Sequence, residues 1–193
     1  MVAKAAATLS ARERLLAAAN ELFYAEGVHT VGIDRVIERA GVAKASLYNT
    51  FGSKDELVRA YLESRHARMA ERITRHLARY ADPRDRLLSV FEAQGEFFAE
   101  PGFRGCAFAS ASAESPGELV EQASGDYRRW VRALLTDLAR EAGAPAPELL
   151  SRQLHMLYDG ASQSARMDRD PGAAAAARAA AATLLDAALA AGS

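Results

Sequence analysis

Residues 30–51 read TVGIDRVIERAGVAKASLYNTF, and this stretch decides the fold. Within residues 33–37, apolar side chains recur at the spacing that places them on one face of a helix. Gly41 then supplies a tight turn, and a second short helix follows over residues 43–50. On that helix Leu47 and the phenylalanine four residues later face inward. Two short helices that cross at a glycine-containing turn form a helix-turn-helix, whose second helix can enter the major groove of DNA.

The remaining side chains of the second helix suit contact with DNA. Ala45 and Ser46 are small and permit close approach, and Tyr48 and Asn49 carry polar groups that can reach phosphates or base edges. Lys44 in this helix and Lys54, at the start of the next one, can neutralise backbone charge. Taken alone, each is equally well explained as an ordinary solvated helix residue.

The rest of the sequence predicts an all-α protein. Ser10–Glu13, Ser53–Glu56 and Ser115–Glu118 match the capping box, in which a hydroxyl and a glutamate three residues later satisfy free amides at a helix start. Asp82-Pro83 and Asp170-Pro171 offer a capping carboxylate followed by proline at the first helical position. Two-residue alternation and hairpin turns are absent, so strands are not expected.

Composition narrows the function classes. The 193-residue chain has a net charge of −1, which argues against a protein that coats DNA by charge alone. Its single cysteine, Cys106, cannot form an intramolecular disulfide and is expected to be a buried small hydrophobe in a reducing cytoplasm. The sequence shows no signal-peptide or membrane-length apolar run, no metal-ligand spacing among its histidines, and no catalytic or cofactor motif. We therefore expect neither an enzyme nor a membrane protein, and no cofactor or metal.

Residues 9–69 strongly resemble the TetR/AcrR family of one-component transcriptional regulators. The resemblance rests on the first helix RERLLAAANELFYAEG, on Thr30, and on the run AGVAKASLYNTFGSKDELV. It implies nine helices, a homodimer formed chiefly by the last two, and a small-molecule ligand in the C-terminal part. By position it assigns the groove-facing role to Lys44, Ala45, Ser46, Tyr48, Asn49 and Thr50, and phosphate contacts to Thr30 and Lys54.

Two departures from the family pattern affect the DNA sequence that is read. The family often has Gly-Thr or Gly-Ser where this chain has Ala45-Ser46, and often histidine where it has Thr50. Helix lengths and motifs together predict a flexible arm over residues 1–8, a DNA-binding domain over 9–53 with its motif at about 32–51, and a ligand-binding and dimerisation domain over 54–193.

Aromatic side chains are plentiful in the C-terminal part, and two explanations stay open. Each one alone is better explained as core, but together they exceed what a tight helical bundle requires, so that some are expected to line an apolar ligand pocket. The candidate pocket residues are Phe91, Phe98, Cys106, Phe108, Tyr127, Trp130 and Met156.

The last two predicted helices mix leucines with small residues, which allow helices to approach closely. This pattern suits either a dimer interface or packing within one chain, and the family resemblance favours the dimer. The candidate interface residues are Leu150, Leu154, Leu157, Ala161, Leu184 and Ala188.

The sequence thus predicts a repressor that leaves a palindromic, double-stranded DNA operator when a small hydrophobic or amphipathic inducer binds. The alternatives are an activator or a regulator without a ligand, and a helical small-molecule-binding protein or enzyme whose helix-turn-helix is vestigial.

Overall fold

The computed structural model describes residues 9–191, so the predicted arm over residues 1–8 lies outside the described residues. Within the described range the protein is all-α, as predicted, with nine helices and no strand. The helices are α2 (Ala11–Glu26), α3 (Ile33–Ala40), α4 (Lys44–Phe51), α5 (Lys54–Leu77), α6 (Pro83–Phe98), α7 (Ala107–Glu114), α8 (Glu118–Glu141), α9 (Pro147–Met167) and α10 (Ala173–Ala190).

The chain divides into two compact units. Among the described residues, one contains 9–67 and 107–125, and the other contains 68–106 and 126–191. Helices α5 and α8 each contribute their two ends to different units, with α5 divided after residue 67 and α8 after residue 125. This division does not coincide with the predicted boundary after residue 53, because the first half of α5 packs with the helices that precede it.

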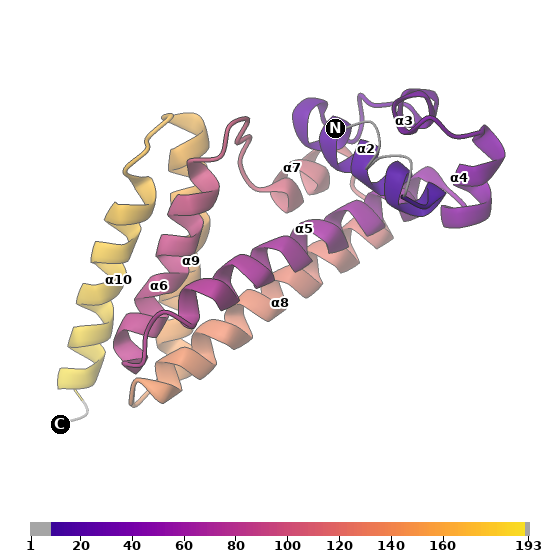
Figure 1. The fold of residues 1–193 in the computed structure, drawn as a ribbon. Coiled ribbons are helices and arrows are strands. Elements are labelled where there is room, and N and C mark those ends of the chain that lie inside the picture. The colour runs from indigo at the N-terminus through magenta and orange to yellow at the C-terminus, as the bar shows by residue number, and fades with distance from the viewer. Residues whose placement is uncertain (1–8, 192–193) are drawn as a thin grey trace. The chain divides into compact units, whose positions relative to one another are not determined.

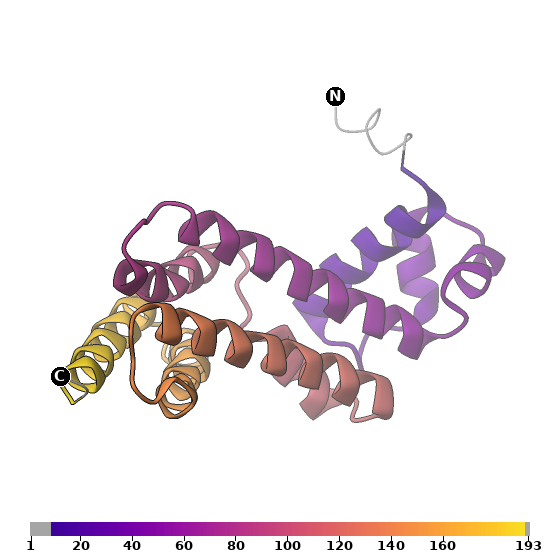
Figure 2. The same ribbon diagram turned by 90° about the horizontal axis from the view of Figure 1, so that it is seen from below.

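In the first unit, α2 packs against both α3 and α4, and Figure 2 shows these three indigo and purple helices gathered in one group. The predicted capping box at the start of α2 is confirmed: the Ser10 hydroxyl accepts from the Glu13 amide, and the Glu13 carboxylate accepts from the Ser10 amide. The buried side chains of α2 include Leu15 and Phe23. The Phe23 ring packs edge-on against Tyr61 of α5, with centroids 5.6 Å apart.

Helix α5 begins as its sequence predicts. The Ser53 hydroxyl accepts from the Glu56 amide at 3.1 Å, which satisfies one of the free amides at the helix start. Asn20 of α2 donates through Nδ2 to Ser64 Oγ of α5 at 3.2 Å. Together with the Phe23–Tyr61 contact, this bond fixes α2 to the first half of α5.

In the second unit, α10 packs against α9 and α6, and the three helices run alongside one another in Figure 1. The predicted cap at the start of α6 is confirmed, since the Asp82 carboxylate accepts from the amides of Arg84 and Asp85. A bidentate ion pair joins Arg84 of α6 to Asp186 of α10, with N–O distances of 2.8 and 2.9 Å. Fully buried side chains of this unit include Leu87, Phe91, Leu135 and Leu154.

Two predicted helix starts are wrong by two residues or more. Helix α8 begins at Glu118 instead of directly after Ser115, and the Gly117 carbonyl accepts its first backbone bond, from Glu121. Helix α10 begins at Ala173. The Asp170 carboxylate accepts from the Gly172 amide at 2.8 Å and so closes the turn before the helix instead of capping it.

Among the described helices, α10 alone is long and apolar enough by composition to cross a bilayer, and a single such helix is weak evidence. Its apolar character comes from alanine, and 28% of its 18 residues are buried inside the chain. Much of an alanine-rich helix face is therefore left uncovered by the rest of this unit.

Candidate nucleic-acid interface

Helices α3 and α4 form the predicted helix-turn-helix. Helix α3 ends at Gly41, whose backbone is left-handed at φ 62° and ψ 45°, a conformation that favours glycine. The Gly41 amide donates to the Glu38 carbonyl at 3.1 Å, and the Val42 amide to the Ile37 carbonyl at 3.3 Å. These bonds satisfy the last carbonyls of α3 and turn the chain into α4.

An arginine of α2 holds this turn in place. Arg14 donates through Nη1 to the Gly41 carbonyl at 3.0 Å, and its Nε atom is buried. The bond ties the left-handed residue that sets the crossing of α3 and α4 to the first helix of the unit. Sequence reasoning missed this role, because the two residues are 27 positions apart and no local pattern connects them.

The orientation of α4 agrees with the predicted groove-facing set. Leu47 is the buried residue of this helix, and it is completely enclosed. Tyr48 is 45% exposed, which is unusual for a large aromatic side chain. The Thr50 hydroxyl donates to the Ser46 carbonyl within the helix at 2.6 Å. Of the predicted set, Lys44, Ala45, Tyr48, Asn49 and Thr50 are exposed, and Ser46 is half-buried.

The starts of the two motif helices carry free backbone amides. Gly32 and Ala43 occupy the cap positions of α3 and α4, and neither helix has a side-chain cap. Uncapped amides at a helix start bind anions, including phosphate. Thr30 is exposed in the turn before α3, and Lys54 is half-buried at the first position of α5.

Three ion pairs cross the surface of this motif. Arg35 of α3 makes a bidentate pair with Glu26 at 2.6 and 2.9 Å, and Arg39 pairs with Glu21 at 2.8 Å. Both pairs attach α3 to α2. The third joins Lys44, the first residue of α4, to Asp34 near the start of α3, at 3.0 Å. The hydrogen bond from Lys44 to Asp34 raises the lysine pKa, so the side chain stays cationic. The sequence analysis did not anticipate a partner for Lys44.

The turn between α2 and α3 accommodates a carboxylate from α7. Gly27 has a φ of 93°, and a Cβ atom added there would lie 2.9 Å from Cδ of Glu114. The same carboxylate accepts from the His29 amide at 3.5 Å. Glycine is favoured at position 27 by its backbone conformation, and it leaves room for the Glu114 carboxylate as placed here.

The predicted pocket residues lie in several places. Phe91 is fully buried, and the Phe98 ring packs against Phe103 with centroids 5.0 Å apart. The Trp130 ring lies 5.9 Å from Tyr127. Cys106 is half-buried, and Phe108 is buried on α7 in the other unit. Met156, by contrast, is 74% exposed on α9, which argues against a place in an internal pocket of one chain.

Buried polar groups accompany these aromatics, and the sequence analysis did not predict their arrangement. The hydroxyls of Tyr127 and Tyr158 hydrogen-bond at 2.7 Å, and burial raises the pKa of both phenols. Gln94 of α6 donates to the Tyr158 carbonyl at 2.9 Å and to Ser162 Oγ at 3.3 Å. Among the described residues, the buried Gln94 Oε1 has no hydrogen-bond partner.

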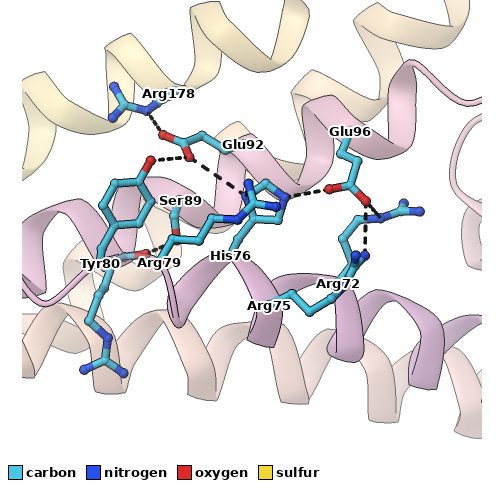
Figure 3. A network of polar contacts seen from close by, with 10 residues as sticks. Arg72, Arg75, His76, Arg79, Tyr80, Ser89, Glu92, Glu96 and Arg178 are labelled. Atoms are coloured by element: carbon cyan, nitrogen blue, oxygen red, sulfur yellow. Dashed lines mark hydrogen bonds and ion pairs between the residues drawn. The ribbon is translucent and has the colours of Figure 1, made fainter.

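A polar network joins the C-terminal half of α5 to α6 and α10, as Figure 3 shows. The buried His76 pairs through Nε2 with Glu96 at 2.8 Å, and this hydrogen bond lowers the pKa of that carboxylate. Glu92 accepts from Tyr80 at 2.8 Å and from Arg178 of α10 at 3.0 Å. Arg72 adds ion pairs to Glu96 and Glu100. The end of α5 is thus fixed to α6 by several charged contacts.

Half of the predicted dimer residues are already used within the chain. Leu150, Leu154 and Ala161 are buried by the packing of the unit itself, because they lie on the inward face of α9. The other three, Leu157, Leu184 and Ala188, are half-buried.

The outward face of α9 carries a stripe that sequence reasoning missed. We call Leu149, Met156, Gly160 and Met167 the α9 stripe; all four are exposed, at 59% for Leu149 and 76% for Met167. Their spacing of seven, four and seven residues keeps them on one side of a helix. The signal was present in the sequence, but it could be separated from the inward face only once α6 and α10 had been placed.

The comparisons with known proteins decide the family. A sequence profile described as "Bacterial regulatory proteins, tetR family" matches residues 15–61. The crystal structure of SCO4454, a TetR-family transcriptional regulator from Streptomyces coelicolor, is similar with a TM-score of 0.86 and 33% identity. That alignment covers 93% of this chain and 96% of that one. The chain belongs to the TetR family.

Other TetR-type relatives differ in the sign of regulation. The repressor NemR of Escherichia coli is 29% identical over 171 residues, which cover 82% of this chain and 85% of NemR. The activator FasR of Mycolicibacterium smegmatis is 38% identical over 86 residues, which cover 45% of this chain and 39% of FasR. This TetR-family protein is accordingly a DNA-binding transcription regulator, and the α3–α4 motif is its helix-turn-helix.

Replacing Leu47 with alanine should destabilise the protein by about 2–5 kcal/mol, since a fully buried leucine is replaced by a cavity. Urea unfolding followed by circular dichroism measures the change. Tyr48→Ala on the same helix is the matched control and should change stability by much less. Equal losses for the two variants would contradict the inward orientation of Leu47.

The second unit should lose stability on mild acidification because of His155. Burial lowers the pKa of this imidazole, helped by Arg128 and Arg132 and opposed by Asp159. A lowered pKa means that the unfolded chain binds the proton more readily, so unfolding is favoured as the pH falls below the ordinary histidine range near 6.5. His155→Gln should therefore flatten the dependence of the free energy of unfolding on pH between 7 and 5.5. His29→Gln, at an exposed position, is the control, and an identical slope in His155→Gln and wild type would refute the role of burial.

Proposed function

We propose that this TetR-family protein is a homodimeric repressor that binds a palindromic operator and leaves it when a small hydrophobic or amphipathic inducer binds. The observation that carries the proposal is the exposed face of α4. A helix anchored by one buried leucine presents Lys44, Ala45, Tyr48 and Asn49 outward, with Ser46 at its edge. Small, polar and cationic groups together are what a major-groove reader needs.

Backbone amides explain how a chain of net charge −1 can hold DNA. The uncapped starts of α3 and α4 offer amides to phosphates, and Thr30 and Lys54 add side-chain contacts beside them. Two copies of α4 in a dimer would occupy successive major grooves about 34–36 Å apart and would read an inverted repeat.

The α9 stripe and α10 are the proposed dimer interface. Exposed methionine and leucine side chains and an alanine-rich helix with 28% of its residues buried form an apolar surface that a second copy would cover. The edge of this proposed interface is formed by three half-buried residues, Leu157, Leu184 and Ala188. Leu150, Leu154 and Ala161 instead support the interface from inside the chain.

The second unit holds the proposed inducer-binding region. Apolar surface in this unit is supplied by Phe91, Phe98, Cys106, Tyr127 and Trp130. The buried Gln94 Oε1 is an acceptor that a hydrogen-bond donor on the inducer would satisfy. An apolar compound with at least one such donor therefore fits the chemistry of these residues.

Helix α5 is the proposed connection between inducer and DNA. It is continuous from Lys54, at the proposed phosphate contact, to the network around His76. An inducer that favours a different position of α6 would displace the end of α5. Fewer dimers would then hold their two copies of α4 at the spacing that DNA binding requires. By thermodynamic linkage, DNA must then weaken inducer binding by the same factor by which the inducer weakens DNA binding.

Whether the protein represses or activates is inferred from how much of each chain the similarities to NemR and FasR cover. The likeness to the repressor NemR spans most of both chains, whereas that to the activator FasR spans less than half of each, which favours a repressor. Activation is the second candidate function, because FasR has the higher identity where it aligns. A bacterial transcription regulator acts in the cytoplasm, which is the location we propose.

Selection of bound sites from a random double-stranded DNA library, at a fixed and stated salt concentration, tests the proposal. We expect a palindromic motif whose half-sites lie about one helical turn, or 10–10.5 base pairs, or a multiple of it apart. Folded wild-type protein that recovers no motif would overturn the proposed function.

The double variant Tyr48→Ala/Lys54→Ala is the control for that selection. It should recover no motif, because a base-reading and a phosphate-binding side chain are both removed. Its thermal unfolding midpoint should stay close to that of the wild type, since neither side chain is buried. A collapse of stability would instead place these residues in the core.

Dimerisation should fail in Met156→Glu. Two negative charges would be brought into an apolar interface at every dimer contact, and the desolvation of a carboxylate is costly. Sedimentation velocity at micromolar concentration should show a monomer for this variant and a dimer for the wild type.

Ala133→Glu is the matched control for the dimer experiment. It adds the same charge to an exposed alanine of α8, outside the α9 stripe. It should sediment as the wild type does. Dimers of unchanged stability in Met156→Glu would rule out the α9 stripe as the interface.

A further inference from the structure

The Lys44–Asp34 pair differs in position from the other two ion pairs of the motif. Those of Arg35 and Arg39 attach α3 to α2 and lie away from the start of α4. Lys44 is the first residue of α4, and Asp34 is the second residue of α3. The pair therefore connects the two helix starts whose uncapped amides are proposed to meet phosphate.

The pair is exposed and can exchange partners. The Lys44 side chain is 60% exposed and that of Asp34 is 83% exposed, with the Nζ–Oδ1 distance at 3.0 Å. Exposed ion pairs contribute little to stability, because water and salt screen them. A phosphate that approaches the start of α4 would thus compete with Asp34 for the same ammonium group.

We propose that Asp34 limits the affinity of the protein for DNA by competing with phosphate for Lys44. This inference rests on the proposed function. When DNA binds, Lys44 exchanges the Asp34 carboxylate for a phosphate oxygen. Asp34 is then left without its cation beside the phosphate backbone, so the gain from the lysine contact is offset. Removal of the carboxylate leaves Lys44 available to phosphate at all times.

Salt dependence separates this exchange from a simple change of charge. A cationic side chain that neutralises one phosphate releases counterions and adds about 0.9 to the slope of log affinity against log salt concentration. A lysine that gives up an existing carboxylate adds little, since the freed carboxylate retains cations near the DNA. The salt dependence of wild-type binding therefore does not include the phosphate contact that Lys44 makes, because Asp34 offsets it.

The test is Asp34→Asn, measured by fluorescence anisotropy on a labelled duplex that carries the selected operator, at salt concentrations from about 50 to 200 mM. We expect operator binding at the lowest salt to tighten roughly 3- to 10-fold, in line with the loss of one competing charge in each subunit. The magnitude of the salt slope should rise by about 0.9 per subunit, or about 1.8 for the proposed dimer. An unchanged dissociation constant and slope would overturn the proposal.

Two comparisons isolate the role of Lys44. Glu38→Gln removes the same charge one turn further along α3 and should leave the dissociation constant within about two-fold. In a Lys44→Gln background, Asp34→Asn should likewise change binding by less than about two-fold, because the competed group is gone. Equal tightening with and without Lys44 would show that Asp34 acts only by general repulsion, and would overturn the proposal.

Two further measurements, the thermal stability of Asp34→Asn and operator binding by the wild type, separate failure of this inference from failure of the proposed function. Asp34→Asn should unfold at the wild-type temperature, since asparagine is tolerated in the first turn of a helix and the pair is exposed. Wild type that binds the operator while Asp34→Asn is unaffected would refute this inference alone. Wild type that selects no operator would refute the proposed function, and this inference with it.

Discussion

The attachment of α4 to its unit depends on the burial of one side chain, Leu47. A short helix has little stability of its own, so packing must hold it in place. Leu47 is the one fully enclosed side chain of this helix, and Phe51 at its end is half-buried, with the Arg12 guanidinium over its ring. The exposed residues between and before them carry no comparable packing role, so their side chains are available for other contacts.

The other helix of the motif is held in a different way. Helix α3 buries Val36 and Ala40 and is also joined to α2 by the ion pairs of Arg35 and Arg39. These arginines are basic residues in a DNA-binding unit, yet both serve its internal architecture. Counting positive charges along the sequence would therefore overstate the electrostatic attraction of this surface for DNA.

Much of the fold could be predicted from sequence because its signals are local. The capping box at Ser10, the hydroxyl cap at Ser53, the carboxylate cap at Asp82 and the left-handed Gly41 each act within a few residues. The prediction at Asp170 failed for a local reason as well, because a turn can use the same side chain that a cap uses. At Ser115 the helix begins two residues later than predicted, at Glu118. The register relative to Leu47 predicted which residues of α4 point away from the core, and of that set all but the half-buried Ser46 are exposed.

The remaining features could not be predicted, because they depend on contacts between distant residues. Nothing near Lys44 in the sequence identifies Asp34 as its partner, and nothing near Gly41 identifies Arg14. The dimer candidates illustrate the same limit. Periodicity shows that α9 has apolar residues on two sides, but only the positions of α6 and α10 reveal that Leu154 faces inward while Met156 faces outward.

The bonds of α2 have a mechanical consequence. Arg14 fixes α2 to the turn between the motif helices, and Asn20 fixes it to Ser64 of α5. These bonds connect the motif to the first half of α5 through α2. A helix of 24 residues is about 36 Å long. A rotation of only 5° about its far end would displace its near end by roughly 3 Å, comparable to the rise of one base pair. Under the proposed function, the length of α5 would therefore turn a small change at the His76 network into a displacement comparable to one base-pair step.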